Sequence, residues 1–142
     1  MKTVQQILNL KPLQVFSVAG NTSVLEALHL MMEKNISALL IIEDRQLLGI
    51  FTERDYARKI ILHGKSSADT PMSAVMTPDP ITVSPSDSID LCMEVMTEKH
   101  IRHLPVTNDQ GAVGMVSIGD VVKFIIADQK QTISQLESYI SS

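Results

Sequence analysis

The chain has 142 residues, enough for one ordinary domain or two small ones, so any enzyme in it would be compact. Its 44% hydrophobic and 20% charged residues are typical of a soluble globular protein, and a net charge of −4 argues against a broad surface for nucleic acid or anionic membrane. The single cysteine, Cys92, excludes an intrachain disulfide, and without a signal peptide or membrane-length apolar run the predicted location is the cytoplasm.

An internal repeat organises the predicted elements. A shift of 65 positions aligns residues 13–61 with 78–126 without a gap, and 12 of the 49 pairs are identical. The first copy predicts a strand at 15–18, a helix capped by Ser23, a hairpin at 39–51 and a helix at 53–62. The second copy predicts the same elements at 81–83, from Ser88, at 104–116 and at 118–127. This order, strand-helix-strand-strand-helix, predicts an α+β fold of two pseudosymmetric units packed sheet to sheet.

Composition changes along the chain predict four segments. These are a first unit with the N-terminal segment (1–64), a linker and lead-in (65–77), a second unit (78–128) and a helical tail (129–142). Residues 64–71, between the units, are rich in Ser, Gly, Asp and Pro, which marks a linker. In the tail, Ile133, Leu136 and Ile140 follow helical spacing, which predicts a short helix docked on the module or on a second copy.

A hydroxyl residue followed three positions later by aspartate ends each copy's hairpin: Thr52 with Asp55, and Ser117 with Asp120. This spacing is that of a capping box, which needs no ligand. It also suits a ribonucleotide, because a carboxylate can hold the ribose diol while the hydroxyl and the free N–H groups of the helix start hold phosphate. Both interpretations remain open from the spacing alone.

The stretch Ile101–Val106 before one hairpin turn, together with the repeated Gly-apolar-apolar-Ser/Thr-x-x-Asp motif, resembles the cystathionine-β-synthase (CBS) domain. Two units in register resemble a tandem CBS pair over nearly the whole chain. The resemblance implies a regulatory module that binds an adenosyl ligand such as AMP, ATP, NAD or S-adenosylmethionine between the units and signals to another protein. It further implies a homodimer, an unidentified regulated protein, no catalytic activity and no contact with nucleic acid or membrane.

The same resemblance assigns two nucleotide sites, each combining one unit's aspartate with residues before the other unit's hairpin. The stronger site is expected to contain Thr52, Arg54, Asp55, Arg58, Thr77, Ile81, Arg102, His103, Leu104 and Pro105. The second is expected to contain Val15, Ser37, Ala38, Leu39, Ser117, Ile118 and Asp120. The first is expected to bind phosphate better, because Arg102 and His103 are replaced by Ser37 and Ala38 in the second.

Two alternatives remain. The chain could be an interaction scaffold whose pockets are vestigial, or a small nucleotide-processing enzyme that uses His103 and Asp55. No phosphate-binding loop of the Walker type and no nucleophile with a base supports an enzyme. His100 and His103 have no carboxylate or cysteine to complete a metal site, so no metal and no catalytic cofactor is expected.

Overall fold

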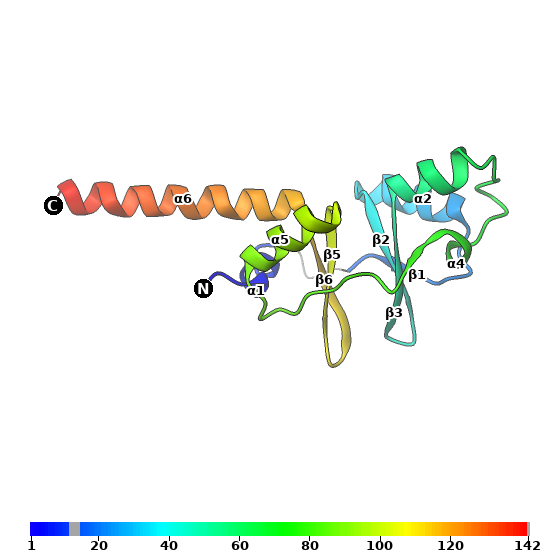
Figure 1. The fold of residues 1–142 in the computed structure, drawn as a ribbon, viewed down its shortest axis with the longest axis horizontal. Helices are drawn as coiled ribbons and strands as arrows, with labels where there is room; N and C mark the ends of the chain where they lie inside the picture. The colour runs from blue at the N-terminus through cyan, green and yellow to red at the C-terminus, as the bar shows by residue number, and fades with distance from the viewer. Residues whose placement is uncertain (12–14, 142) are drawn as a thin grey trace.

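The structure, a computed structural model, describes residues 1–11 and 15–141, and the chain forms two halves with a long helix projecting from one of them (Figure 1). The first half contains β1 (Ser17–Val18), α2 (Val24–Lys34), β2 (Ala38–Glu43), β3 (Gln46–Thr52), α3 (Glu53–Asp55), the π-helix η1 (Tyr56–Ile61), α4 (Met72–Val75) and β4 (Thr77–Pro78). The second half contains α1 (Val4–Leu8), α5 (Ile89–Lys99), β5 (His103–Asn108), β6 (Gly111–Ser117) and α6 (Ile118–Ser141).

The predicted α+β fold is confirmed. In the first half the strand order is β1-β2-β3-β4, with β1 parallel to β2 and the other neighbours antiparallel. In the second half β5 and β6 form the predicted hairpin. The strand predicted at 81–83 is reduced to one parallel bridge between Val83 and Val106, so the two halves repeat each other with a shorter sheet in the second.

Matching caps fix the two repeated helices. The hydroxyl of Ser23 accepts the N–H of Glu26 at 3.1 Å, and that of Ser88 accepts the N–H of Leu91 at 3.0 Å. Each thereby satisfies one of the free N–H groups at a helix start. Both helices end at a left-handed residue, Asn35 (φ 54°) and His100 (φ 55°), which turns the chain toward the following strand.

Each half has its own apolar core, and the two cores exchange segments. Val4 and Ile7 of α1 are buried with the second half, where the Val4 N–H donates to the Asp87 carbonyl at 2.9 Å. Met72 and Val75 of α4 are buried with the first half. The predicted boundaries therefore differ from the structure at both places: the N-terminal segment belongs to the second core, and α4 extends the first beyond residue 64. Short apolar helices are not stable alone in water, so α1 packs on the second core and α4 packs on the first.

A third apolar cluster lies between the two sheets. Side chains alternate along β2, so Leu39 and Ile41 point into the first core, whereas Ala38 and Leu40 are buried with Ile50 in the cluster that also includes Met115 of β6. The two halves are therefore packed sheet to sheet, as the repeat predicts.

The C-terminal tail differs from its prediction. Residues 129–141 continue α6, which spans 24 residues, and they are exposed along a helix that points away from both halves (Figure 1). No Gly or Pro follows Gly119 before Ser141, so nothing in the sequence interrupts the helix. Docking of the tail on its own module is therefore wrong. Among the described residues, no helix is both long and apolar enough to cross a membrane.

Gly49 provides a test of the β3–β4 contact. A Cβ atom there would lie 2.6 Å from the Met76 sulfur and 2.8 Å from the Thr77 carbonyl oxygen, which is backbone and cannot move aside cheaply. We expect Gly49→Ala to lower the free energy of unfolding by about 1–3 kcal/mol in urea denaturation. Gly119→Ala is the matched control, since its Cβ would meet only the Ser117 hydroxyl at 3.7 Å. A control as destabilised as Gly49→Ala would contradict this explanation.

Candidate functional site

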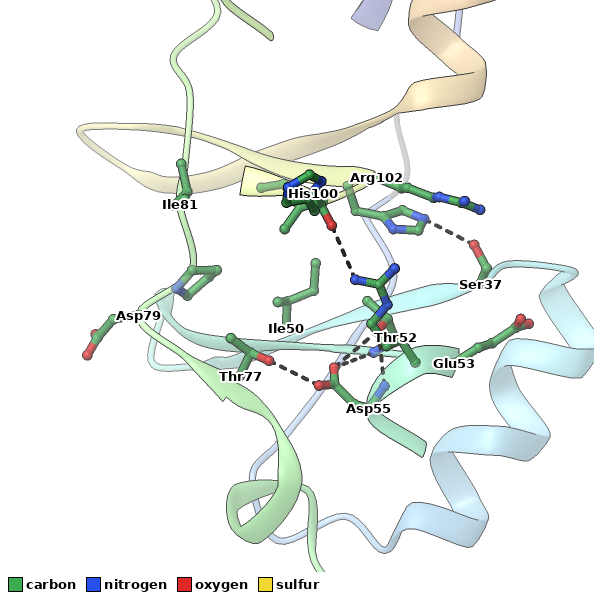
Figure 2. A pocket seen from close by; sticks show the side chains of 14 residues that line it. Ser37, Ile50, Thr52, Glu53, Asp55, Thr77, Asp79, Ile81, His100 and Arg102 are labelled. Carbon is green, nitrogen blue, oxygen red and sulfur yellow. Dashed lines mark hydrogen bonds between the residues drawn. The ribbon is translucent and has the colours of Figure 1, made fainter. Parts of the chain in front are cut away.

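A pocket of about 480 Å³ lies where the two halves meet (Figure 2). Its walls come from the end of β3 and the start of α3, from the segment around β4, and from the segment that joins α5 to β5. The lining residues are Ser37, Ile50, Thr52, Glu53, Arg54, Asp55, Thr77, Asp79, Pro80, Ile81, His100, Ile101, Arg102 and His103. Residues from both repeats therefore share one cavity.

Asp55 is the buried charged residue of this wall, with 8% of its surface exposed. Its Oδ2 accepts the Thr52 N–H at 2.9 Å and the Thr52 hydroxyl at 3.2 Å, which is the predicted capping box. Its Oδ1 accepts the Thr77 hydroxyl at 3.1 Å and pairs with the Lys59 ammonium at 3.1 Å. All four acceptor positions of the carboxylate are thus in use.

Lys59 belongs to η1, the π-helical segment that continues from α3. Its ammonium group also donates to the Val75 carbonyl at 3.0 Å and to the Thr77 hydroxyl at 3.4 Å. Lys59 therefore ties the helix that begins at the carboxylate to the segment leading into β4. π-Helical segments are rare and often lie at functional sites.

The opposite wall brings cationic and polar groups toward the carboxylate. The Arg54 guanidinium donates to the His100 carbonyl at 3.2 Å, and the ring Nε2 of His103 lies 3.0 Å from the Ser37 hydroxyl (Figure 2). Burial lowers the pKa of His103, although the Asp120 charge acts in the opposite direction. The ring is therefore mainly neutral at pH 7 and acts there as a hydrogen-bonding group.

The structure brings together most of the residues predicted for the stronger site. Thr52, Arg54, Asp55, Thr77, Ile81, Arg102 and His103 line the pocket. Arg58 is exposed and not among the lining residues, while Leu104 and Pro105 are buried behind the wall. Because side chains alternate along β5, Leu104 points into the second core, and Pro105, opposite Met115 in the hairpin, lies on the other face.

Six lining residues were not predicted from the sequence: Ile50, Glu53, Asp79, Pro80, His100 and Ile101. Lys59, which holds the carboxylate from outside the lining, was also missed. The signal for Ile50 and Glu53 was available, because both stand within the Gly49–Asp55 motif. His100 and Asp79 (φ 46°) both have a left-handed backbone conformation, which turns the remaining residues, Pro80 and Ile101 among them, toward the pocket. A residue pattern does not reveal such a conformation.

Asp120, the counterpart of Asp55, has a different partner. Its Oδ2 accepts the Ser117 N–H at 2.9 Å and also the Lys11 ammonium at 2.7 Å, while Lys11 donates to the Met115 carbonyl at 2.7 Å. Burial by itself would raise the pKa of Asp120, but the hydrogen bonds and charge of Lys11, with those of Ser117, outweigh it and lower the pKa. A cation of the chain itself therefore occupies this carboxylate.

The other residues predicted for the second site are dispersed. Ala38 and Leu39 are buried in β2, and Val15 packs on the cluster between the sheets. Ile118 is exposed at the start of α6, and Ser37 lines the Asp55 pocket.

No group of three or more metal-ligating side chains occurs in the part of the chain that the structure describes. Cys92 is buried in the second core, and burial raises the pKa of its thiol, which keeps it protonated and unreactive at neutral pH.

Comparison with known proteins identifies a matching family profile and several relatives. The sequence profile of the CBS domain matches residues 8–62 and again residues 72–127. The mitochondrial CBS domain-containing protein CBSX3 of Arabidopsis thaliana is 42% identical over 123 residues, which cover 83% of this chain and 60% of that protein. The CBS domain-containing protein YhcV of Bacillus subtilis is 32% identical, with 76% of each chain covered. This chain thus spans a little over half of the plant relative and three quarters of the bacterial one.

Solved structures of proteins with CBS domains have the same fold as this chain. A signal-transduction protein with CBS domains from Burkholderia ambifaria superposes with a TM-score of 0.86 at 46% identity, covering 90% of this chain and 96% of that one. The CBS domain pair of protein MJ0100, solved in complex with 5′-methylthioadenosine and S-adenosyl-L-methionine, has a TM-score of 0.79 at 27% identity and covers 90% of this chain and 98% of its own.

The Lys11–Asp120 pair predicts a pH-dependent loss of stability. The pair holds the folded-state pKa of Asp120 below its unfolded value, so its stabilisation is present above the unfolded pKa and disappears as pH falls through the folded pKa. We expect Lys11→Met to raise the Asp120 pKa, followed by NMR titration of the carboxyl carbon, and to cost on the order of 1 kcal/mol at pH 7, a cost that shrinks as pH falls through the folded pKa of Asp120.

Lys2→Met is the matched control, because it removes an exposed pair with Asp128 (3.1 Å) from the same segment. It should leave the pKa of Asp120 unchanged. An equal shift in both variants would show that general charge, rather than the direct contact, sets this pKa.

Proposed function

Because this chain belongs to the CBS-domain family as a tandem pair, we propose that it is a regulatory module that binds an adenine nucleotide (AMP, ATP or NAD) beside Asp55 and signals occupancy to a partner protein. The observation that carries the proposal is that residues of both repeats line the pocket around that carboxylate. A homodimer, the absence of catalysis and a cytoplasmic location belong to the same proposal. For comparison, one relative is described as mitochondrial.

Ribose binding at Asp55 requires an exchange of hydrogen bonds. Oδ2 is held by the backbone and hydroxyl of Thr52, which fix the carboxylate, whereas Oδ1 is held by two side-chain donors from other segments, Thr77 and Lys59. Ribose hydroxyl groups can replace either donor at Oδ1. Lys59 keeps its bond to the Val75 carbonyl, so the displaced ammonium stays near the site as a cation.

The rest of the pocket suits a base and a phosphate. Ile50, Ile81 and Pro80 offer an apolar surface of the kind on which a purine packs. Arg54 and Arg102 supply permanent positive charge for phosphate, opposed at the rim by Glu53 and Asp79. The complex of MJ0100 with two adenosyl compounds supports the ligand class.

Signalling follows from the position of the pocket. Thr52 and Asp55 belong to the first repeat, while Arg102 and His103 belong to the second, so a ligand that touches both stabilises one relative orientation of the halves. The shift equals the difference in ligand affinity between the orientations. The Asp120 carboxylate, already paired with Lys11, is the weaker nucleotide site in this proposal.

Removing the Asp55 charge should remove nucleotide binding. Asn has the same size and keeps an acceptor for the Thr52 N–H, but it loses the second anionic acceptor for the ribose. We expect Asp55→Asn to weaken nucleotide binding at least tenfold in calorimetry, about 1.4 kcal/mol, while Asp120→Asn changes it little.

The ligand itself is found by a thermal-shift screen of the wild type with AMP, ATP, NAD and S-adenosylmethionine. Ligand at about 100 times its Kd adds about 2.7 kcal/mol and raises Tm by several degrees. No shift with any of the four would favour the scaffold alternative, and turnover of the bound nucleotide would favour the enzyme.

Arg102 should discriminate AMP from adenosine. Arg102 lines the pocket and is exposed, so its expected contact is with a phosphate at the mouth. We expect Arg102→Met to weaken AMP by about tenfold, or ~1.4 kcal/mol, and adenosine by much less in the same titration. Arg58→Met removes an equal charge outside the lining and should affect neither ligand. Equal losses for AMP and adenosine would contradict the phosphate role of Arg102.

A further inference from the structure

Helix α6 carries two separate apolar stripes. One faces the second half: Val121 is fully buried there, Phe124 and Ile125 pack on the same core, and Asp128 pairs with Lys2 at 3.1 Å. The other stripe lies beside it, because its residues are offset from these by about a third of a turn around the helix. The helix is therefore held by one face and leaves a second apolar face uncovered.

The second stripe, which we call the seam, alternates steps of four and three residues along the helix. Its members are Val122, Ile126, Gln129, Ile133, Leu136 and Ile140. All six are exposed, from 47% at Val122 to 81% at Ile140 for the apolar members. This spacing is that of the a and d positions of a coiled coil, with isoleucine at every a position (126, 133 and 140).

We propose that the seam pairs with the seam of a second copy of this chain, in a parallel two-stranded coiled coil. The inference gives a surface to the homodimer proposed above and does not depend on nucleotide binding. β-Branched residues at a with leucine at d favour two strands in parallel coiled coils, and the seam has isoleucine at every a position and leucine at one d position, Leu136. The last turns also need a partner, because a helical extension of about a dozen residues is only marginally stable in water without packing.

Gln129 decides the orientation. In a parallel pair, Gln129 faces Gln129 of the partner subunit, and the two amides can hydrogen-bond to each other. In an antiparallel pair that buries the whole seam, Gln129 faces Ile133 of the partner subunit without a hydrogen-bond partner.

The parallel arrangement sets the two second halves beside each other. α6 starts immediately after Ser117, which pairs with His103 in the β5–β6 hairpin. The coiled coil therefore begins next to the pocket wall in each copy. A change in the orientation of the halves would reach the second copy through the base of this helix.

Sedimentation equilibrium of the full chain tests the seam. We expect the wild type to be a dimer and the double variant Ile133→Glu/Leu136→Glu to dissociate, with a dimer Kd at least a hundredfold higher. Gln131→Glu/Ser138→Glu adds the same two charges to the outward face of the same helix and should remain dimeric. A monomeric wild type, or a seam variant as dimeric as the control, would overturn the proposal.

Disulfide formation tests the orientation without relying on a disruptive variant. The native Cys92 is buried, so a new cysteine on α6 reports separately. Gln129→Cys should form an intermolecular disulfide under mild oxidation, because the two residues share one layer of a parallel pair. Gln131→Cys, facing outward, should not. Failure of Gln129→Cys to cross-link, or equal cross-linking of both, would overturn the parallel seam. Nucleotide-induced thermal shifts of the seam variant should persist, so this result and the nucleotide result can fail separately.

Discussion

The apolar layer between the two sheets positions the residues that line the pocket. Ala38, Leu40 and Ile50 are buried there against the side of β6 that carries Met115. Because strand side chains alternate, the residues that fill this layer also fix which residues at the strand ends face the opposite half. The carboxylate of one repeat and the Arg102–His103 pair of the other meet only as a consequence of this contact.

The two repeats use one local motif for two different purposes. Thr52 with Asp55 and Ser117 with Asp120 form the same helix cap, since the cap depends only on residues three positions apart. The two repeats differ in the cation that pairs with each carboxylate. Lys59 serves Asp55 from the next helical turn, but its counterpart in the second repeat is Phe124, which is needed for core packing. Lys11 supplies the missing charge from the N-terminal segment.

The different lysine partners of the two aspartates link the fold to the proposed regulation. Both carboxylates pair with a lysine of the chain: Asp55 with Lys59 of the following helical segment, and Asp120 with Lys11 of the N-terminal segment. Asp55 lines the pocket between the halves, whereas Asp120 is not among its lining residues. The long helix then extends the second half beyond the module, where its uncovered seam offers a contact to a second copy (Figure 1).

The sequence by itself determined the features that depend on near neighbours: the repeat, the strands and helices, the caps at Ser23 and Ser88, and the motif that contains Asp55. It also predicted the imbalance between Arg102–His103 and Ser37–Ala38, because the repeat aligns those positions. Only the tertiary structure decided that α1 joins the second core, that Lys11 pairs with Asp120, that His100 and Ile101 turn into the pocket, and that α6 leaves the module. These depend on contacts between distant residues and on left-handed turns, and neither has a periodic signature in the chain.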